Sequence, residues 1–210
     1  MLCREIGLSC GCPADDQLAT GRELTTKRLL QLNWREEMIS GALRVAEMLH
    51  LPRILFMILS LVPSHPFTDY FHGVEEIDAV RQTFGDMTGE VLSSLEVQFI
   101  RFAGYMGVNP SNGNLLVNPN YLNNGDELDI YLDLVHELVH VRQWREGKSL
   151  FGGNYKYVDR PTEVEAYRCA VEEAKRQGLS SKRICTYLKT EWMSEDDLRQ
   201  LAKTLGVECP

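Results

Sequence analysis

The chain has 210 residues, of which 44% are hydrophobic and 25% are charged, as expected of a globular protein with one sizeable core or a core with a small subdomain. Its formal net charge is −8, which argues against nucleic acid as the main partner because phosphate binding needs a basic surface. The most apolar stretch, residues 54–62, is far shorter than the ~20 residues that cross a bilayer. We therefore expect a buried helix there and no membrane span.

Residues 1–13 have neither a basic leader nor a continuous apolar core, so they do not resemble a signal peptide. Without a leader, we interpret the cysteines as reduced thiols and predict a cytoplasmic protein. The pair Cys10 and Cys12 would suit half of a metal site, but no matching cysteine or histidine pair lies at finger spacing. The six cysteines are Cys3, Cys10, Cys12, Cys169, Cys185 and Cys209.

The first third of the chain favours helices. Residues 17–49 carry leucine, valine and methionine partly at spacings of three and four, which predicts a helix. Residues 63–66 contain two prolines and predict a turn. Residues 74–84 predict a second helix, which can continue after a break at Gly85. We expect three histidines of this region to be structural or exposed: His50, His65 and His72.

A small sheet is predicted next. Residues 95–102 alternate between apolar and polar side chains for most of their length, which indicates a half-buried strand. Residues 104–113 are rich in Gly, Asn and Pro and predict a loop. Residues 115–117 predict a second short strand, which Asn118 and Pro119 end.

The second half of the chain is predicted to be helical. Residues 123–126 form a turn that begins a strong helix at 127–146, and a loop at 147–160 leads to a helix at 162–177. Ser180 and Ser194 each suit the N-cap of a short closing helix. The order of these elements predicts an α+β, mainly helical fold.

The segment His136-Glu137-Leu138-Val139-His140 carries the chemistry. Residues four apart lie one turn apart on the same helix face, so the two imidazoles can share one zinc ion at about 2.0–2.1 Å. The glutamate can reach a zinc-activated water without binding the metal, which suits Glu137 to the role of general base. The five-residue pattern alone is only moderately specific.

The composition of the surrounding helix strengthens the metal interpretation. At ~100° per residue, the polar side chains fall in one sector about 120° wide, and apolar side chains cover most of the remainder. A helix of this kind must be buried on most of its circumference, so its histidines face a cleft or an internal site. The polar sector contains Asp129, Asp133, His136, Glu137, His140 and Gln143.

A catalytic zinc needs a third protein ligand and one open position, and no histidine follows His140. The candidates are Asp159, Glu163 and Glu165. On the helix at 162–177, Glu163 lies within the apolar face, where a carboxylate is costly unless it is paired or bound to metal. Glu165 lies on the opposite side and can act as the N3 partner of an N-cap at Thr162. We therefore predict Glu163 as the third ligand, with Glu165 as the alternative.

These two motifs together resemble the gluzincin metallopeptidases. More narrowly, they resemble the minimal intracellular forms, the ImmA/IrrE-like and mini-gluzincin domains, which pair a His-Glu-x-x-His helix with a Glu-x-x-Ala helix, here Glu163 to Ala166. The resemblance implies a zincin-like core at 74–178, with an N-terminal helical region at 1–73 and a C-terminal helical tail at 179–210. It also implies that residues 113–117 form an edge strand that can pair with an extended substrate.

One position departs from the pattern of this family. Many members carry Asp or Asn four residues after the ligand glutamate, where it supports the first histidine, but here that residue is Tyr167. We expect Asp129 or Asp133 to supply this support instead. Candidates for an oxyanion donor are Tyr155, Tyr157, Tyr167 and Arg142.

The resemblance implies a zinc-dependent peptidase that acts on a protein or peptide substrate. Two alternatives remain open: a non-catalytic zinc-binding domain that regulates or binds a partner protein, and a helical interaction module in which the motif is accidental. Retention of Glu137 favours catalysis, because a structural site has no need of a base. The sequence gives no indication of the oligomeric state.

Overall fold

The computed structural model describes residues 62–101, 104–150 and 155–209. The helix expected at 17–49, nearly all of the apolar stretch 54–62 and the Cys10–Cys12 pair lie outside the described residues. Within them the fold is α+β and mainly helical, as predicted. None of the described helices is long and apolar enough to cross a membrane.

The first part of the described chain forms one short strand and two short helices, joined by 3-10 turns. The turn predicted at 63–66 was wrong, because Ser64–Pro66 form strand β1, which pairs with β2 (Glu96–Phe99) at the edge of a sheet. Strand β1 is followed by the 3-10 turns η2 (Phe67–Asp69) and η3 (Val74–Glu76). The predicted helix at 74–84 is shorter in the structure, because α4 spans Asp78–Phe84. The chain then breaks at Gly85, through the 3-10 turn η4 (Gly85–Met87), and continues as α5 (Thr88–Ser94).

A four-stranded sheet follows in the order β1-β2-β4-β3. Strands β2 (Glu96–Phe99) and β4 (Leu115–Val117) are parallel, whereas β1 and β3 (Met106–Val108) pair antiparallel with their neighbours. The prediction that 113–117 is an edge strand was wrong, because β4 lies between β2 and β3. The edge strands are β1 and β3, and β3 lies inside the stretch that we predicted to be a loop. A three-residue strand with a central glycine is too short to show an alternating pattern.

The turn between β3 and β4 packs against a tryptophan. Gly113 has φ +77°, and a Cβ atom there would lie 2.4 Å from the ring of Trp144. The indole Nε1 of Trp144 donates a hydrogen bond of 2.9 Å to the carbonyl of Pro110 in the same turn. Only glycine suits this position, because it needs both a left-handed backbone and contact between the backbone and the ring.

The remaining helices agree well with the sequence. The short helix α6 (Pro119–Asn124) was not predicted, but α7 (Glu127–Arg145) and α8 (Pro161–Arg176) begin and end within a residue or two of the predicted helices. Between them lies the 3-10 turn η5 (Tyr157–Asp159). Ser180 and Ser194 cap α9 (Ser181–Leu188) and α10 (Glu195–Leu205) as predicted.

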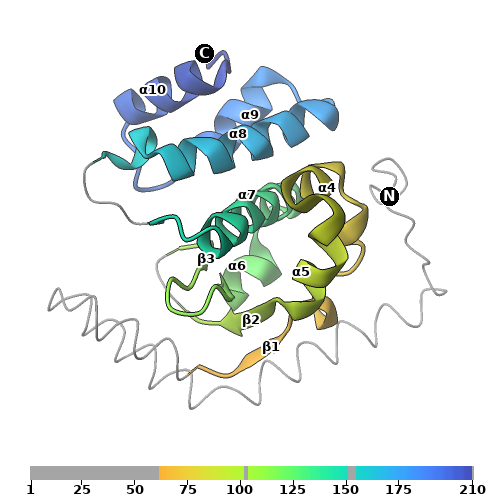
Figure 1. Cartoon of the computed structure of the whole chain (residues 1–210). Helices are drawn as coiled ribbons and strands as arrows, with labels where there is room; N and C mark the ends of the chain where they lie inside the picture. Colours follow the sequence, from red (N-terminus) through yellow and green to blue (C-terminus); the bar gives the residue numbers. More distant parts are fainter. Residues whose placement is uncertain (1–61, 102–103, 151–154, 210) are drawn as a thin grey trace, which may run out of the picture.

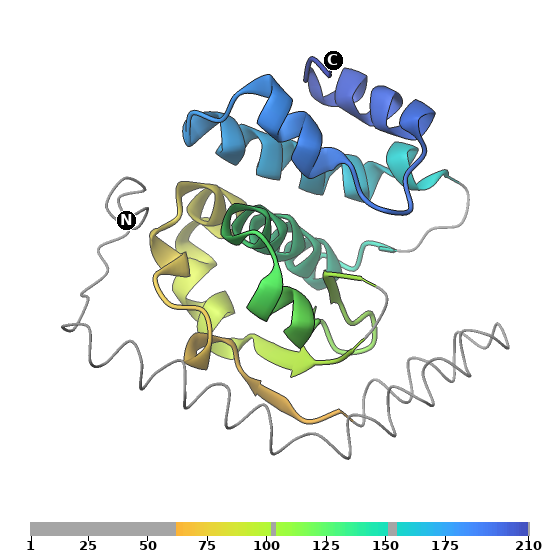
Figure 2. The same cartoon turned by 180° about the vertical axis from the view of Figure 1, so that it is seen from behind.

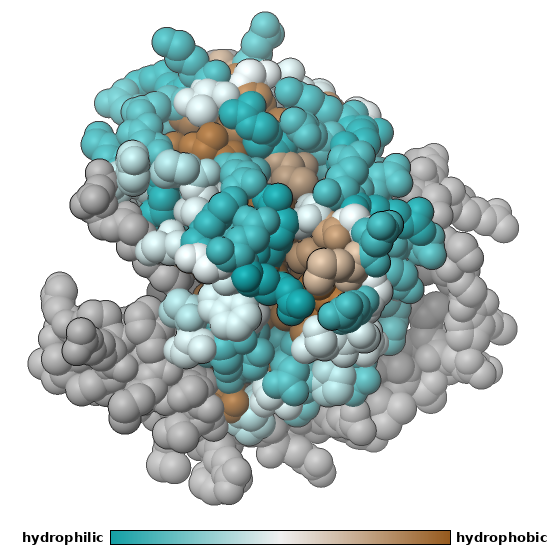
Figure 3. All heavy atoms as spheres, in the orientation of Figure 1, coloured by the Kyte–Doolittle hydropathy of each residue, from teal (hydrophilic) through white to brown (hydrophobic). Residues whose placement is uncertain are grey.

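Helix α7 lies between two hydrophobic clusters. Figures 1 and 2 show α8, α9 and α10 as a layer on one side of α7, with the sheet, α4 and α5 on the other. Leu134, Val135, Leu138 and Val141 pack into the sheet-side cluster, and Leu132 packs into the cluster of the C-terminal helices. The surface over the C-terminal helices is mainly hydrophilic and includes small apolar areas (Figure 3). The predicted domain boundaries stay predictions.

One expectation about the cysteines was wrong. Cys185 of α9 and Cys209 form a disulfide, with their Cα atoms 5.4 Å apart. The fold brings these residues together, which their spacing in the sequence does not reveal. Cys169 keeps a free thiol. The cytoplasmic location that we inferred from reduced thiols stays a prediction.

Candidate metal centre

Helix α7 presents the histidines from a buried position. Asp126 caps the helix, because its carboxylate accepts hydrogen bonds from the backbone N–H groups of Leu128 and Asp129. Every residue from Leu134 to Val141 is buried, including the polar ones. This agrees with the prediction of a helix that is apolar around most of its circumference, with a polar sector facing an internal site.

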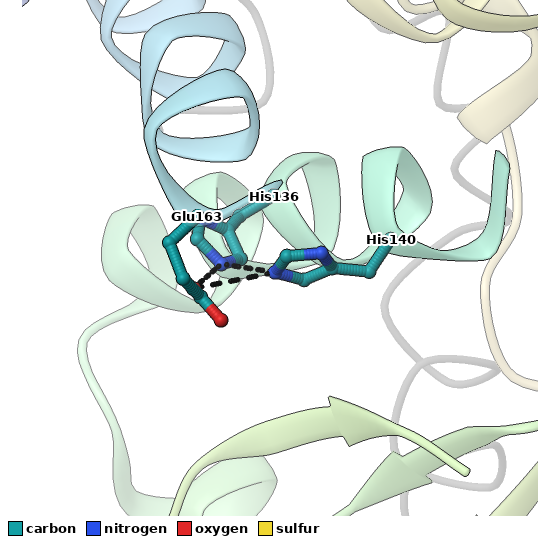
Figure 4. Close-up of side chains that lie close together, drawn as sticks. All are labelled: His136, His140 and Glu163. Carbon is teal, nitrogen blue, oxygen red and sulfur yellow. Dashed lines mark hydrogen bonds and ion pairs between the residues drawn. The ribbon is translucent and has the colours of Figure 1, made fainter. Parts of the chain in front are cut away.

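The two histidines converge as their spacing predicts. The Nε2 atoms of His136 and His140 are 3.0 Å apart, and both side chains are buried. The rings meet edge to face, with their centroids 4.7 Å apart. Each ring therefore turns the same nitrogen toward one point in space (Figure 4).

Glu163 completes a cluster of three. Pro161 occupies the first turn of α8, where its missing N–H has no cost, and the helix then points Glu163 toward α7. Its Oε2 atom lies 3.5 Å from His136 Nε2 and 3.4 Å from His140 Nε2 (Figure 4). The ligand atoms all lie within 4.8 Å of one another, so this buried cluster could hold a metal ion. The structure thus brings together the three predicted ligands.

Glu165 is directed elsewhere. Its carboxylate forms ion pairs with Arg142 and Lys148 and accepts a hydrogen bond of 2.8 Å from Gln143 Nε2. The predicted N-cap at Thr162 was wrong, because the N-cap of α8 is Arg160, two residues earlier. The carboxylate of Asp159, the other candidate ligand, accepts a hydrogen bond from the side-chain amide of Gln200. Neither alternative joins the cluster.

Gln143 orients the second histidine, a role that the sequence analysis missed. Its Oε1 atom lies 2.7 Å from His140 Nδ1, and its Nε2 donates to the carbonyl of Thr162 at 3.0 Å. A proton on Nδ1 of His140 leaves the lone pair of Nε2 free for a metal. The position of Gln143 within the polar sector of α7 was the available signal.

The first histidine has no such support. His136 Nδ1 is buried and has no hydrogen-bond partner in the described residues. The expectation that Asp129 or Asp133 supports it was wrong, because Asp129 pairs with Arg183 at 2.6 Å and Asp133 accepts a hydrogen bond of 2.6 Å from the hydroxyl of Tyr121. Instead, the ring of Tyr167 packs edge-on against His136, with centroids 4.3 Å apart.

Charges within the cluster are strongly coupled. Burial alone would raise the pKa of Glu163, but hydrogen bonds from His136 and His140 outweigh it and hold that pKa well below its usual range. Burial disfavours the charged form of both histidines and lowers the pKa of His136. For His140 the hydrogen bond to Glu163 prevails and raises its pKa to about 9. The cluster therefore favours a positive charge beside Glu163.

Glu137 is buried in the same region, and its carboxyl group forms no ion pair within the described residues. Its Oε2 atom has no hydrogen-bond partner among the described residues. Burial raises the pKa of this carboxyl to about 8. A cation bound by the neighbouring cluster would favour the ionised form and lower this pKa.

Two of the four predicted oxyanion donors face the site. The hydroxyls of Tyr157 and Tyr167 lie 3.0 Å apart, and both residues line the pocket that contains the cluster. Tyr155 is exposed. Arg142 is held by Glu165.

The pocket has a volume of about 420 Å³ and opens beside β3. Its walls come from β3, α6, α7, η5, the first two turns of α8, and the end of α9 with the loop that follows it. The three candidate ligands and Glu137 all contribute to the lining. A buried donor set that adjoins an open pocket is the arrangement of a catalytic rather than a closed structural metal site.

No protein-family model matches the chain, and no similar curated protein or solved structure was found. The chemistry of the site must therefore be inferred from its own residues.

Proposed function

We propose that this protein is a zinc-dependent peptidase in which His136, His140 and Glu163 hold the metal and Glu137 is the general base. The observation that carries the proposal is the convergence of three ligand atoms beside an unpartnered buried carboxylate at the wall of an open pocket. A closed structural site would need neither the fourth carboxylate nor the pocket.

The donor set fits zinc. Tetrahedral bonds of about 2.0–2.1 Å place ligand atoms about 3.3 Å apart, and the three distances in the cluster are 3.0, 3.4 and 3.5 Å. Two imidazoles favour zinc over magnesium or calcium, which prefer oxygen ligands. Two imidazoles with one carboxylate, and one position left open, form a known catalytic zinc set.

The roles of the other residues follow from their positions. Zinc at this site would supply a Lewis acid that polarises a peptide carbonyl and makes water more acidic. Glu137 would take a proton from the attacking water and return it to the leaving amine. Tyr157 and Tyr167 are the candidates to donate a hydrogen bond to the developing oxyanion. The edge strand β3 lines the pocket and offers backbone groups that can pair with an extended peptide.

The test is the Glu137→Gln variant. We expect its kcat for peptide cleavage to fall by about 10²–10⁴-fold, which is the usual contribution of a general base, while its zinc content stays equal to that of the wild type. Glu172→Gln is the matched control, because Glu172 lies exposed on α8, and it should cleave as the wild type does. Equal cleavage by the wild type and Glu137→Gln would contradict the mechanism.

A non-catalytic zinc-binding domain is the second candidate. The observation that favours it is the unpartnered Nδ1 atom of His136, because ligating histidines in enzymes are normally held through their second nitrogen. Purified wild type that retains zinc but cleaves no peptide would support this candidate. Protein that binds no zinc would leave only an interaction module.

A further inference from the structure

The pocket extends along α7 beyond the metal cluster to a second carboxylate. Asp133 lies one turn before His136 and also lines the pocket. It accepts a hydrogen bond of 2.6 Å from Tyr121. No described Lys or Arg forms an ion pair with it. The nearest acidic neighbour on the helix, Asp129, is already paired with Arg183.

The pocket offers no cation of its own to Asp133. Lys189 contributes to the lining, but its ammonium pairs with Glu195 at 2.5 Å. A zinc ion in the cluster would balance Glu163, and Glu137 is the proposed base. Asp133 is thus a carboxylate of the pocket that has no ion-pair partner in the described residues and no role in the proposed chemistry.

A row of aromatic rings leads from Asp133 to the surface. The ring of Tyr121, whose hydroxyl touches Asp133, lies 4.6 Å from that of Tyr105. The ring of Tyr105 lies 5.5 Å from that of Trp192, and Trp192 is 54% exposed. All three line the pocket. Aromatic faces beside a carboxylate attract the cation and the aliphatic stem of a basic side chain.

An unpartnered hydroxyl also faces this part of the pocket. The side chain of Thr190 is 92% buried, being 8% exposed, and its Oγ1 atom has no partner among the described residues. Tyr187 also lines the pocket. Its hydroxyl is near enough to Asp133 to affect the pKa of the Asp133 carboxyl, but it forms no hydrogen bond of normal geometry with the described residues. Buried polar groups normally find a partner, so these hydroxyls point to a polar ligand.

We propose that Asp133, Tyr105, Trp192 and Thr190 form a subsite that accepts a lysine or arginine side chain of the substrate. This inference rests on the proposed peptidase function, because it names the substrate class of that same pocket. The aliphatic stem lies against the rings, the cationic group meets Asp133, and Thr190 accepts a hydrogen bond from it. A carboxylate in a partly desolvated pocket gains most from a cation that brings its own hydrogen-bond donors.

The electrostatics of the neighbouring side chains agree with this assignment. Burial and, after it, the nearby carboxylates of Glu191, Asp133 and Asp129 raise the pKa of Tyr105. Burial raises the pKa of Asp133 to about 6, so the carboxylate is largely ionised at neutral pH. Uncharged or acidic side chains would leave that charge unbalanced.

The experiment compares pairs of peptides that differ at one residue, which is lysine in one and norleucine in the other. Norleucine keeps the four-carbon stem of lysine and lacks its ammonium group, and the variable residue is moved stepwise across the scissile bond. The ratio of kcat/KM for lysine over norleucine is measured with the zinc-loaded full chain. At one position we expect a ratio of at least about 10. Asp133→Asn should bring that ratio to within about twofold of one, and Trp192→Ala should lower it in part.

The matched control is Glu127→Gln, which removes a carboxylate from an exposed position of the same helix. It should leave the ratio unchanged, because only charge within the pocket meets the side chain. A ratio near one at every position, or a high ratio that survives Asp133→Asn, overturns the subsite.

A binding measurement separates the subsite from the peptidase mechanism. The zinc-loaded Glu137→Gln variant is titrated with the same peptide pairs by calorimetry, with and without Asp133→Asn. Tighter binding of the lysine peptide that Asp133→Asn abolishes, together with no cleavage by the wild type, supports the subsite and overturns the peptidase. Cleavage without a lysine preference does the reverse, and neither binding preference nor cleavage overturns both.

Discussion

The two sides of α7 contribute differently to the metal centre. The sheet-side cluster holds the helix that carries both histidines and Glu137, so these residues are placed by the geometry of one helix. The C-terminal helices contribute Glu163 alone to the cluster, through the packing of α8 on α7. The histidine pair therefore depends only on the local geometry of α7. The complete set of candidate ligands forms only when α8 packs against α7 in the correct position.

The largest effect should come from the ligand that crosses this boundary. Glu163→Ala should lower zinc affinity on the order of a thousand-fold, because loss of a direct ligand exceeds the 10–100-fold typical of supporting residues. Glu165→Ala, in the same turn of α8, removes ion pairs with Arg142 and Lys148 and one hydrogen bond from Gln143. Gln143 keeps its hydrogen bond to the carbonyl of Thr162, so the affinity should change by less than about threefold. Chelator competition measures both constants. The reverse order would contradict the ligand assignment.

Truncation of the two clusters tests whether the layers fold as one unit. Leu138 and Leu201 are fully buried on opposite sides of α7, and replacing either with alanine should cost about 3–5 kcal/mol. Since α7 contributes to both clusters, we expect each variant to shift one shared transition in urea unfolding followed by circular dichroism. Two separate transitions would show that the layers are independent.

The disulfide sharpens the comparison, because it lies entirely within the C-terminal layer. Cys185 and Cys209 are separated by 24 residues, and Cys209→Ser should lower the stability of the oxidised protein by about 3 kcal/mol. Thermal unfolding with and without a reductant measures this cost, and the wild type should lose the same amount on reduction. Cys169→Ser is the control, and its stability should respond to the reductant as the wild type does.

The smallest expected effect concerns a polar contact between the layers. Glu173 of α8 is buried and accepts hydrogen bonds from Tyr131 of α7 at 2.7 Å and from Gln177 at 2.8 Å, beside an ion pair with Arg176. Burial alone would raise the pKa of Glu173, but these partners outweigh it and lower that pKa. A lowered pKa in the folded state stabilises the fold above the unfolded pKa of about 4.3, and this contribution is lost as the pH falls through the folded value.

Glu173→Gln should therefore cost about 2 kcal/mol at pH 7, and the difference from the wild type should shrink below about pH 4. Urea unfolding across this pH range measures it, with the exposed neighbour Glu172→Gln as control. A cost that stays constant with pH would assign the effect to shape rather than to charge.

What the sequence predicted follows the same division. The spacing of the histidines and the helical periodicity of the two motif helices predicted the ligands, because both depend on the regular geometry of a helix. The disulfide depends on a contact between distant segments, for which a single sequence contains no signal. Gln143 lies one turn from His140 on the same helix, so its place in the polar sector of α7 was a signal for its supporting role. Strand β3 escaped prediction because its three residues are defined by their pairing with β4 rather than by composition.

The contact between Gly113 and Trp144 fixes how closely the turn between β3 and β4 approaches α7. Trp144 lies one turn beyond His140 on α7, and its ring packs against the turn that leads from β3 to β4. The thickness of one indole ring therefore determines the distance between α7 and the turn that joins β3 to β4. A larger side chain at Gly113, or a smaller one at Trp144, would change the separation between α7 and β3 and so the width of the pocket. The three candidate metal ligands would keep their positions.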